Sequence, residues 1–225
     1  MKRLLLLLLC LSLLVLSGCS EASLTSLVET LNNVGISLPE PEPAAPEVRP
    51  ALLTGEALEI VELLDGSFDQ DIRLIDFTAP ADARRLVITQ WALETGEWGA
   101  REDDAIGLSG GESGRIVLGY ETLLEGASIA VSMDGVIYSC SHEGLAEADA
   151  SAMERLTAYL TTPTAITLET DIPLLYQIQS KGTGVSDVPL ERWQDTEQFA
   201  PYTNVALVTV RFSAVPLGPS EPPQP

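Results

Sequence analysis

The most regular alternation of hydrophobic and polar positions lies in residues 129–140. Apolar side chains recur at every second position on both sides of Asp134-Gly135, a pair that favours the two-residue turn of a β-hairpin. A turn of this length pairs Met133 with Val136, Val131 with Tyr138 and Ile129 with Cys140. All six side chains share one face of the predicted hairpin, and we expect that face to be buried.

Other segments also have the length and alternation of β-strands. They lie at residues 71–78, 85–94, 115–122, 165–169, 172–179 and 205–212, with a turn at 94–97. Residues 57–64 are ambiguous between strand and helix, and helical composition predicts one short helix within 146–160. Roughly seven to nine short strands with few helices predict a mainly β fold, an antiparallel β-sandwich formed by a single domain at residues 51–215.

Three segments are predicted to lie outside the strands. Residues 102–114 combine acidic residues with glycines and serines and form a predicted loop. Residues 188–201 are irregular and contain Trp193. Residues 216–225 are rich in proline and have nothing to bury, so we expect a disordered tail.

The N-terminus has the pattern of an exported protein. Lys2 and Arg3 precede residues 4–16, an almost wholly apolar run that is shorter than the roughly 20 residues of a membrane-spanning helix. The segment Leu16-Ser17-Gly18-Cys19 follows this run. It resembles the lipobox of bacterial lipoproteins, which reads Leu-x-Gly/Ala-Cys.

The resemblance implies that residues 1–18 are a signal peptide and that cleavage occurs between Gly18 and Cys19. A diacylglycerol with acyl chains such as palmitate would be joined to the sulfur of Cys19, and two such chains hold a protein stably on a bilayer. The chain would then lie on the cell membrane and face outside the cytoplasm. The alternative is an ordinary signal peptide, cut nearby, that leaves a soluble secreted protein.

Residues 19–50 are predicted to form a tether that is rich in proline and glutamate. Four apolar residues near its start have helical spacing: Leu24, Leu27, Val28 and Leu31. Residues 20–36 are therefore either a short amphipathic helix or a frayed segment. Residues 39–50 have proline at nearly every second or third position, which favours an extended conformation spanning roughly 35–40 Å.

Charge and cysteine content narrow the choice of partners. The chain has 12 basic and 33 acidic residues, and removal of Lys2 and Arg3 with the signal peptide leaves 10 basic residues and a net charge of −23. Such a chain lacks the basic patch that nucleic acid requires, and an anionic membrane repels it, so the lipid must provide attachment. Only Cys19 and Cys140 remain after cleavage, so we expect no internal disulfide.

Cys140 and His142 are the first candidates for chemistry. A catalytic thiol needs a base and a third group that orients the base, and His142 is the only histidine in the chain. The hairpin register places Cys140 opposite Ile129, so packing in the core is the favoured interpretation. Zinc needs three or four ligands, and this segment provides two. The sequence therefore predicts no catalytic residue.

Two polar segments could bind ions. Residues 109–114 are rich in glycine but lack the Gly-Lys-Ser/Thr ending of a phosphate loop, and Glu112 lies where phosphate would bind. We interpret them as a flexible loop. Glu102, Asp103 and Asp104 provide the oxygen ligands that Ca²⁺ prefers, without the spacing of a calcium loop, so a solvated acidic turn is the alternative.

Trp98, Trp193 and Tyr202 lie in or beside predicted loops, where they either stack against a ligand such as a sugar or close the ends of the core. The leading hypothesis is a non-enzymatic surface lipoprotein that presents an acidic β-rich domain for binding or structural support. The alternatives are an accessory substrate- or carbohydrate-binding lipoprotein and an extracellular hydrolase without a recognisable motif.

Overall fold

The computed structural model describes residues 45–55, 59, 71–123, 125–143, 154–181, 186 and 188–217. These residues belong to one compact unit, Ala44–Pro225. Among them, no helix has the length and hydrophobicity needed to cross a bilayer. The predicted lipid site at Cys19, most of the tether, the ambiguous segment 57–64 apart from Glu59, and the tail from residue 218 lie outside the described residues.

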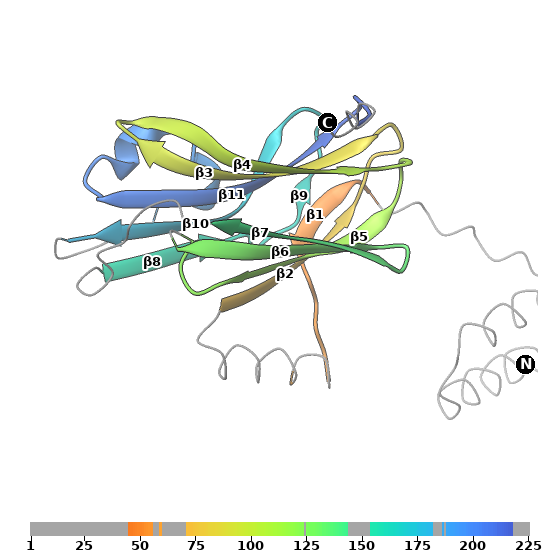
Figure 1. The fold of residues 1–225 in the computed structure, drawn as a ribbon, viewed down its shortest axis with the longest axis horizontal. Coiled ribbons are helices and arrows are strands. Elements are labelled where there is room, and N and C mark those ends of the chain that lie inside the picture. Colours follow the sequence, from red (N-terminus) through yellow and green to blue (C-terminus); the bar gives the residue numbers. More distant parts are fainter. Residues whose placement is uncertain are drawn as a thin grey trace, which may run out of the picture. The chain divides into compact units, whose positions relative to one another are not determined.

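Two antiparallel sheets form the fold, as the alternation of apolar positions predicts (Figure 1). Sheet A contains β1 (Glu47–Pro50), β2 (Asp71–Thr78), β5 (Ser113–Tyr120), β6 (Gly126–Met133), β7 (Val136–Glu143) and β9 (Thr164–Ala165). Sheet B contains β3 (Arg85–Glu94), β4 (Glu97–Gly107), β8 (Glu154–Tyr159), β10 (Asp171–Ser180) and β11 (Asn204–Ser213). Their strand orders are β7-β6-β5-β2-β1-β9 and β4-β3-β11-β10-β8. The prediction of a mainly β, sandwich-like fold is confirmed.

The core lies between the two sheets. Phe77 of β2 and Phe212 of β11 meet across it, with ring centroids 5.5 Å apart. Ile116 of sheet A and Ile88 of sheet B are also fully buried. Each such side chain stabilises the fold by roughly 1.5–3 kcal/mol relative to an exposed position.

The predicted hairpin is confirmed in its register. β6 and β7 pair Met133 with Val136, Val131 with Tyr138 and Ile129 with Cys140. Asp134 and Gly135 have φ values of 48° and 76°, the left-handed conformation that a two-residue turn requires and that glycine adopts without strain. The burial of this face is uneven, because Val131 is buried whereas Val136 and Tyr138 are exposed at the far edge of sheet A.

Three sequence predictions are wrong at the level of elements. Residues 102–114 do not form one loop, because β4 continues to Gly107. The predicted short helix at 146–160 is wrong in its second half, since Glu154–Tyr159 is strand β8, and residues 144–153 lie outside the described ones. Only Thr164–Ala165 forms strand β9, instead of a strand over 165–169. Pairing with β3 and β10 made the first two segments strands against their local composition, whereas β1 pairs only with Thr164 and Ala165 of the third.

The tether also ends earlier than its proline content suggests. Glu47–Pro50, the last part of the predicted spacer, forms β1 between β2 and β9. Val48 is fully buried and pairs with Phe77, whereas the neighbouring Arg49 is half exposed. The sandwich therefore starts before residue 51.

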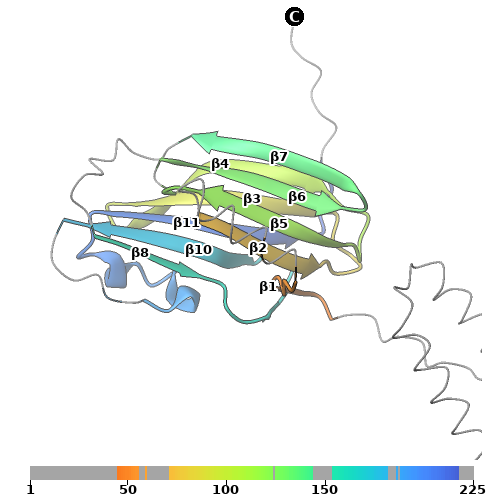
Figure 2. The same cartoon turned by 90° about the horizontal axis from the view of Figure 1, so that it is seen from below.

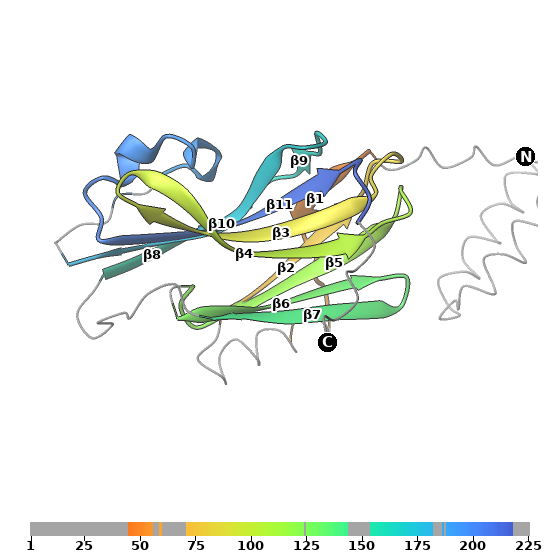
Figure 3. The same cartoon turned by 45° about the horizontal axis from the view of Figure 1, so that its top comes forward.

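Two short 3₁₀ helices, η2 (Leu190–Arg192) and η3 (Thr196–Phe199), form the irregular segment that the sequence predicts at 188–201. They coil beside the turn between β3 and β4 (Figure 3). β4 is an edge strand of sheet B and β7 is an edge strand of sheet A. The two strands run beside each other (Figure 2). This meeting of two edge strands positions the candidate site.

Candidate functional site

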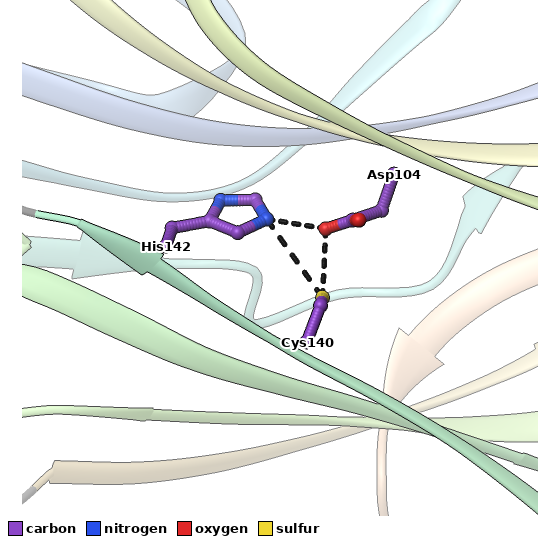
Figure 4. A group of neighbouring side chains, drawn as sticks. All are labelled: Asp104, Cys140 and His142. Carbon is purple, nitrogen blue, oxygen red and sulfur yellow. Dashed lines mark hydrogen bonds and ion pairs between the residues drawn. The ribbon is translucent and has the colours of Figure 1, made fainter. Parts of the chain in front are cut away.

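Asp104, Cys140 and His142 form a cluster between the two sheets (Figure 4). Cys140 and His142 are two positions apart on β7, so both side chains point to the same face, into the sandwich. Asp104 reaches them from β4. One ligating atom from each residue lies within 4.8 Å of the other two.

A β-bulge in β4 turns Asp104 toward the interior. The pairing of β3 with β4 shifts between Gln90 and Trp91, so that Gln90 pairs with Glu102, Trp91 pairs with Ala100, and Arg101 is left unpaired. The extra residue reverses the faces of the strand beyond it. Asp104 consequently pairs with the buried Ile88 and faces the core side of sheet B.

The Asp104 carboxylate lies between the other two side chains. Its Oδ2 atom is 2.7 Å from the Cys140 sulfur and is also in direct contact with Nε2 of His142. The sulfur and Nε2 are 3.7 Å apart. The side chain of His142 is 3% exposed and that of Asp104 is 34% exposed, so the cluster opens toward solvent on the Asp104 side.

Gln90 fixes the orientation of the imidazole ring. This fully buried side chain donates a hydrogen bond from Nε2 to the carbonyl oxygen of Leu123 over 2.9 Å, which directs its Oε1 atom to Nδ1 of His142 at 3.0 Å. An amide oxygen only accepts, so Nδ1 carries the proton and Nε2 faces Asp104 and Cys140. The sequence gives no signal for this role, because a glutamine in a strand has no local mark of burial.

The polar contacts continue through the interior beyond Gln90. The amide of Leu123 donates to Oε1 of Gln177, and Thr122 donates to the same oxygen over 2.8 Å. Gln179 donates to Thr122, and Gln177 donates to Thr157 of β8. This buried network holds the Thr122–Leu123 backbone and, through it, the amide of Gln90. Buried hydrogen bonds of this kind limit the positions that the groups they join can take.

The geometry shares two contacts with the relay of a thiol nucleophile and its base, because Nε2 of His142 faces the sulfur and Nδ1 is held by Gln90, and it differs in the position of Asp104. In such a relay the base contacts the nucleophile with one nitrogen and an orienting group with the other. Here the Asp104 carboxylate lies against both the sulfur and Nε2 of His142, and the sulfur is closer to this carboxylate than to the imidazole. The three surface cavities described, of about 360–490 Å³, have none of these residues in their linings.

The prediction that Cys140 packs in the core is confirmed in part. Cys140 pairs with Ile129 and packs against core residues, yet it is only partly buried and its sulfur contacts Asp104. The sequence does not reveal the contact between Cys140 and Asp104, because these two residues lie on different sheets.

The acidic turn proposed at Glu102, Asp103 and Asp104 is wrong, because all three lie within strand β4. Adjacent residues of a strand face opposite sides, so Asp103 and Asp104 do not converge on one ion. Asp103 is exposed, whereas Asp104 belongs to the cluster above. The calcium interpretation of the whole run stays a prediction.

The aromatic candidates pack mainly against one another. Trp98 lies 6.0 Å from Trp193 and 5.8 Å from Phe199 between ring centroids, and its Nε1 donates to the carbonyl oxygen of Trp193 over 2.9 Å. Trp193 is buried. Tyr202 is partly buried, exchanges hydrogen bonds with the backbone of Ser186, and lines a surface cavity of about 480 Å³. The structure thus favours closure of the core for the two tryptophans.

Residues 109–112 form a loop, as predicted, whereas Ser113 and Gly114 of the predicted loop begin strand β5. The Glu112 carboxylate accepts hydrogen bonds from the backbone amides of Ser109 and Gly110 and so fills the place of an anion. Burial acts to raise the pKa of Glu112, but these hydrogen bonds outweigh it and lower the pKa overall.

Comparisons of the chain with protein-family models, with curated proteins and with solved structures found no match. The fold and the site by themselves define the class: an antiparallel β-sandwich with a mixed Asp–Cys–His cluster between its sheet edges.

Proposed function

We propose that this chain is a surface lipoprotein that acts by binding or structural support. A lipid on Cys19 anchors it to the cell membrane, and the acidic β-sandwich faces outside the cytoplasm. The observation that carries the proposal is the segment Leu16-Ser17-Gly18-Cys19 behind a short apolar run. A sandwich that starts at Glu47 leaves residues 20–46 to separate the lipid from the folded domain.

The site geometry supports binding over catalysis. The Cys140 sulfur contacts the Asp104 carboxylate, and none of the three described cavities has this cysteine in its lining. A nucleophile must be reachable by its substrate, and none of the described cavities leads to this sulfur. Mutual packing of Trp98 and Trp193 also leaves fewer aromatic faces for a sugar, which disfavours the carbohydrate-binding alternative.

The anchor is tested by substitution of Cys19. We expect Cys19→Ala to release the protein into the soluble fraction or to leave the precursor uncleaved, because no sulfur accepts the diacylglycerol. Membrane fractionation and mass spectrometry of the N-terminus provide the readout. Cys140→Ser is the matched control and should stay in the membrane fraction. Retention of Cys19→Ala in the membrane with unchanged mass would contradict the proposal.

A further inference from the structure

Three different ligating atoms meet in the Asp104–Cys140–His142 cluster: a carboxylate oxygen, a sulfur and an imidazole nitrogen. The geometry points to a binding site for one zinc-type divalent ion, which goes beyond the proposed anchoring role. Ca²⁺ and Mg²⁺ take oxygen ligands, whereas sulfur and nitrogen together select Zn²⁺ and metals that share its ligands. The two-ligand objection from the sequence no longer applies, because Asp104 supplies the third ligand.

Gln90 prepares His142 for this role. A metal-binding histidine commonly donates its other ring N–H to a carbonyl or carboxylate, which fixes the tautomer and the ring. The contact between Nδ1 of His142 and Oε1 of Gln90, 3.0 Å long and fully buried, is of this kind. It directs Nε2 at Cys140 and Asp104, where a bound ion would replace the proton that the contact between Nε2 and the carboxylate requires.

The distances fit an ion after one side chain moves. Two ligands of a tetrahedral zinc lie about 3.3–3.7 Å apart, given the usual metal–ligand bond lengths. The sulfur of Cys140 and Nε2 of His142 already lie 3.7 Å apart. The Asp104 carboxylate is closer to both and must withdraw by about 1 Å, which brings it into the range of zinc ligands. Asp104 lies on an edge strand and its side chain is more exposed than that of His142, so it can make this shift.

The charges also match a divalent ion. When a metal binds, the thiol proton of Cys140 and the proton between His142 and Asp104 leave to solvent, and the thiolate, Nε2 and the carboxylate bind the ion. The thiolate and the Asp104 carboxylate carry two negative charges, and neutral His142 adds none, so the ligands neutralise a 2+ ion. Neutrality matters here because an uncompensated charge between two sheets is costly.

Cobalt provides the test, because Co²⁺ takes zinc ligands and a Co²⁺–thiolate bond absorbs near-ultraviolet light. The full-length chain is purified in detergent, stripped with a chelator and titrated with Co²⁺. We expect one ion per chain, a sulfur-to-cobalt absorption band, displacement by Zn²⁺ and no displacement by excess Ca²⁺. Cys140→Ser should abolish the band, whereas Cys19→Ser should keep it.

Two neighbouring aspartates provide a matched pair of variants. Asp104→Asn should weaken Co²⁺ binding at least about 100-fold, and Asp103→Asn, which removes the same charge from the opposite face, should change it less than about twofold. Gln90→Leu should weaken binding roughly 10–100-fold through the ring orientation. Circular dichroism verifies that each variant is folded.

Two results would overturn the site. One is a wild-type chain that binds Co²⁺ without the sulfur band, a readout that needs no variant to fold. The other is an equal loss of affinity in Asp103→Asn and Asp104→Asn, which would assign the binding to the acidic surface. Neither result depends on the lipid, so failure of the anchor and failure of the metal site are distinguishable.

Discussion

Trp98 and Asp104 belong to the same strand, β4, and their side chains lie on opposite faces of sheet B. Trp98 packs against Trp193 on the outer face, and Asp104 contacts His142 on the inner face. Trp98 and Asp104 are separated by an even number of positions, which in a regular strand would place both side chains on one face. The unpaired Arg101 between them reverses the face to which the following side chains point. The same bulge therefore places Trp98 in the aromatic cluster and Asp104 in the candidate metal site.

Deletion of Arg101 tests this relationship. Without the bulge, either Trp98 or Asp104 must leave its partners, and we expect a loss of about 2–4 kcal/mol in the free energy of unfolding. Arg101→Ala keeps the chain length and removes only an exposed ion pair with Glu94, so it should cost less than about 1 kcal/mol. Urea denaturation followed by tryptophan fluorescence compares the two. Equal costs would show that the bulge is dispensable.

Val48 tests whether β1 is part of the folded domain. Val48→Ala removes two buried methyl groups opposite Phe77 and should cost about 2 kcal/mol in unfolding free energy. Arg49→Ala, on the exposed side of the same strand, should change stability by less than about 0.5 kcal/mol. Thermal and urea denaturation measure both. If Val48→Ala left the free energy of unfolding unchanged, β1 would belong to the tether and not to the folded domain.

Cys140→Ser should cost about 1 kcal/mol, because the hydroxyl keeps a donor toward Asp104 but loses the contacts of the larger sulfur with the core. In the wild-type chain, we expect a thiol reagent to label Cys140 slowly in the native state and rapidly in urea. Labelling at equal rates in both states would mean that the sulfur is freely accessible, and it would reopen a catalytic interpretation.

Asp171 gives a prediction for pH dependence. Burial raises the pKa of this carboxyl, Asp103 adds to the increase, and Arg211 and Thr209 oppose it. Because the folded state holds the proton to a higher pH than the unfolded state, the contribution of Asp171 to stability is present below the unfolded pKa. It is lost as pH rises through the folded pKa.

Asp171→Asn removes this titration. The difference in urea midpoint between wild type and variant should therefore shift in favour of the variant as pH rises from about 4 toward neutrality, the range above an ordinary aspartate pKa. Asp103→Asn is a useful companion, because it should reduce the pH dependence without abolishing it. A difference between wild type and Asp171→Asn that is constant across this range would contradict the raised pKa.

Local sequence determined the parts of the fold that depend on neighbouring residues. The Asp134-Gly135 turn and the alternation around it fixed the β6–β7 register, because turn length and side-chain period agree on one pairing. Strands β2 and β3 have the bounds that their apolar patterns predict. The same reasoning placed Cys140 opposite Ile129, on the inward face of β7.

Only the tertiary structure decided the rest. Glu47–Pro50 and Glu154–Tyr159 became strands because neighbouring strands offered them hydrogen bonds and a core to cover, which outweighed proline content and helical composition. Asp104 joined Cys140 and His142 through a bulge and the meeting of two sheet edges, and Gln90 gained its role from burial. A one-dimensional pattern does not encode such contacts, because they depend on which strands become neighbours when the two sheets close over a common core.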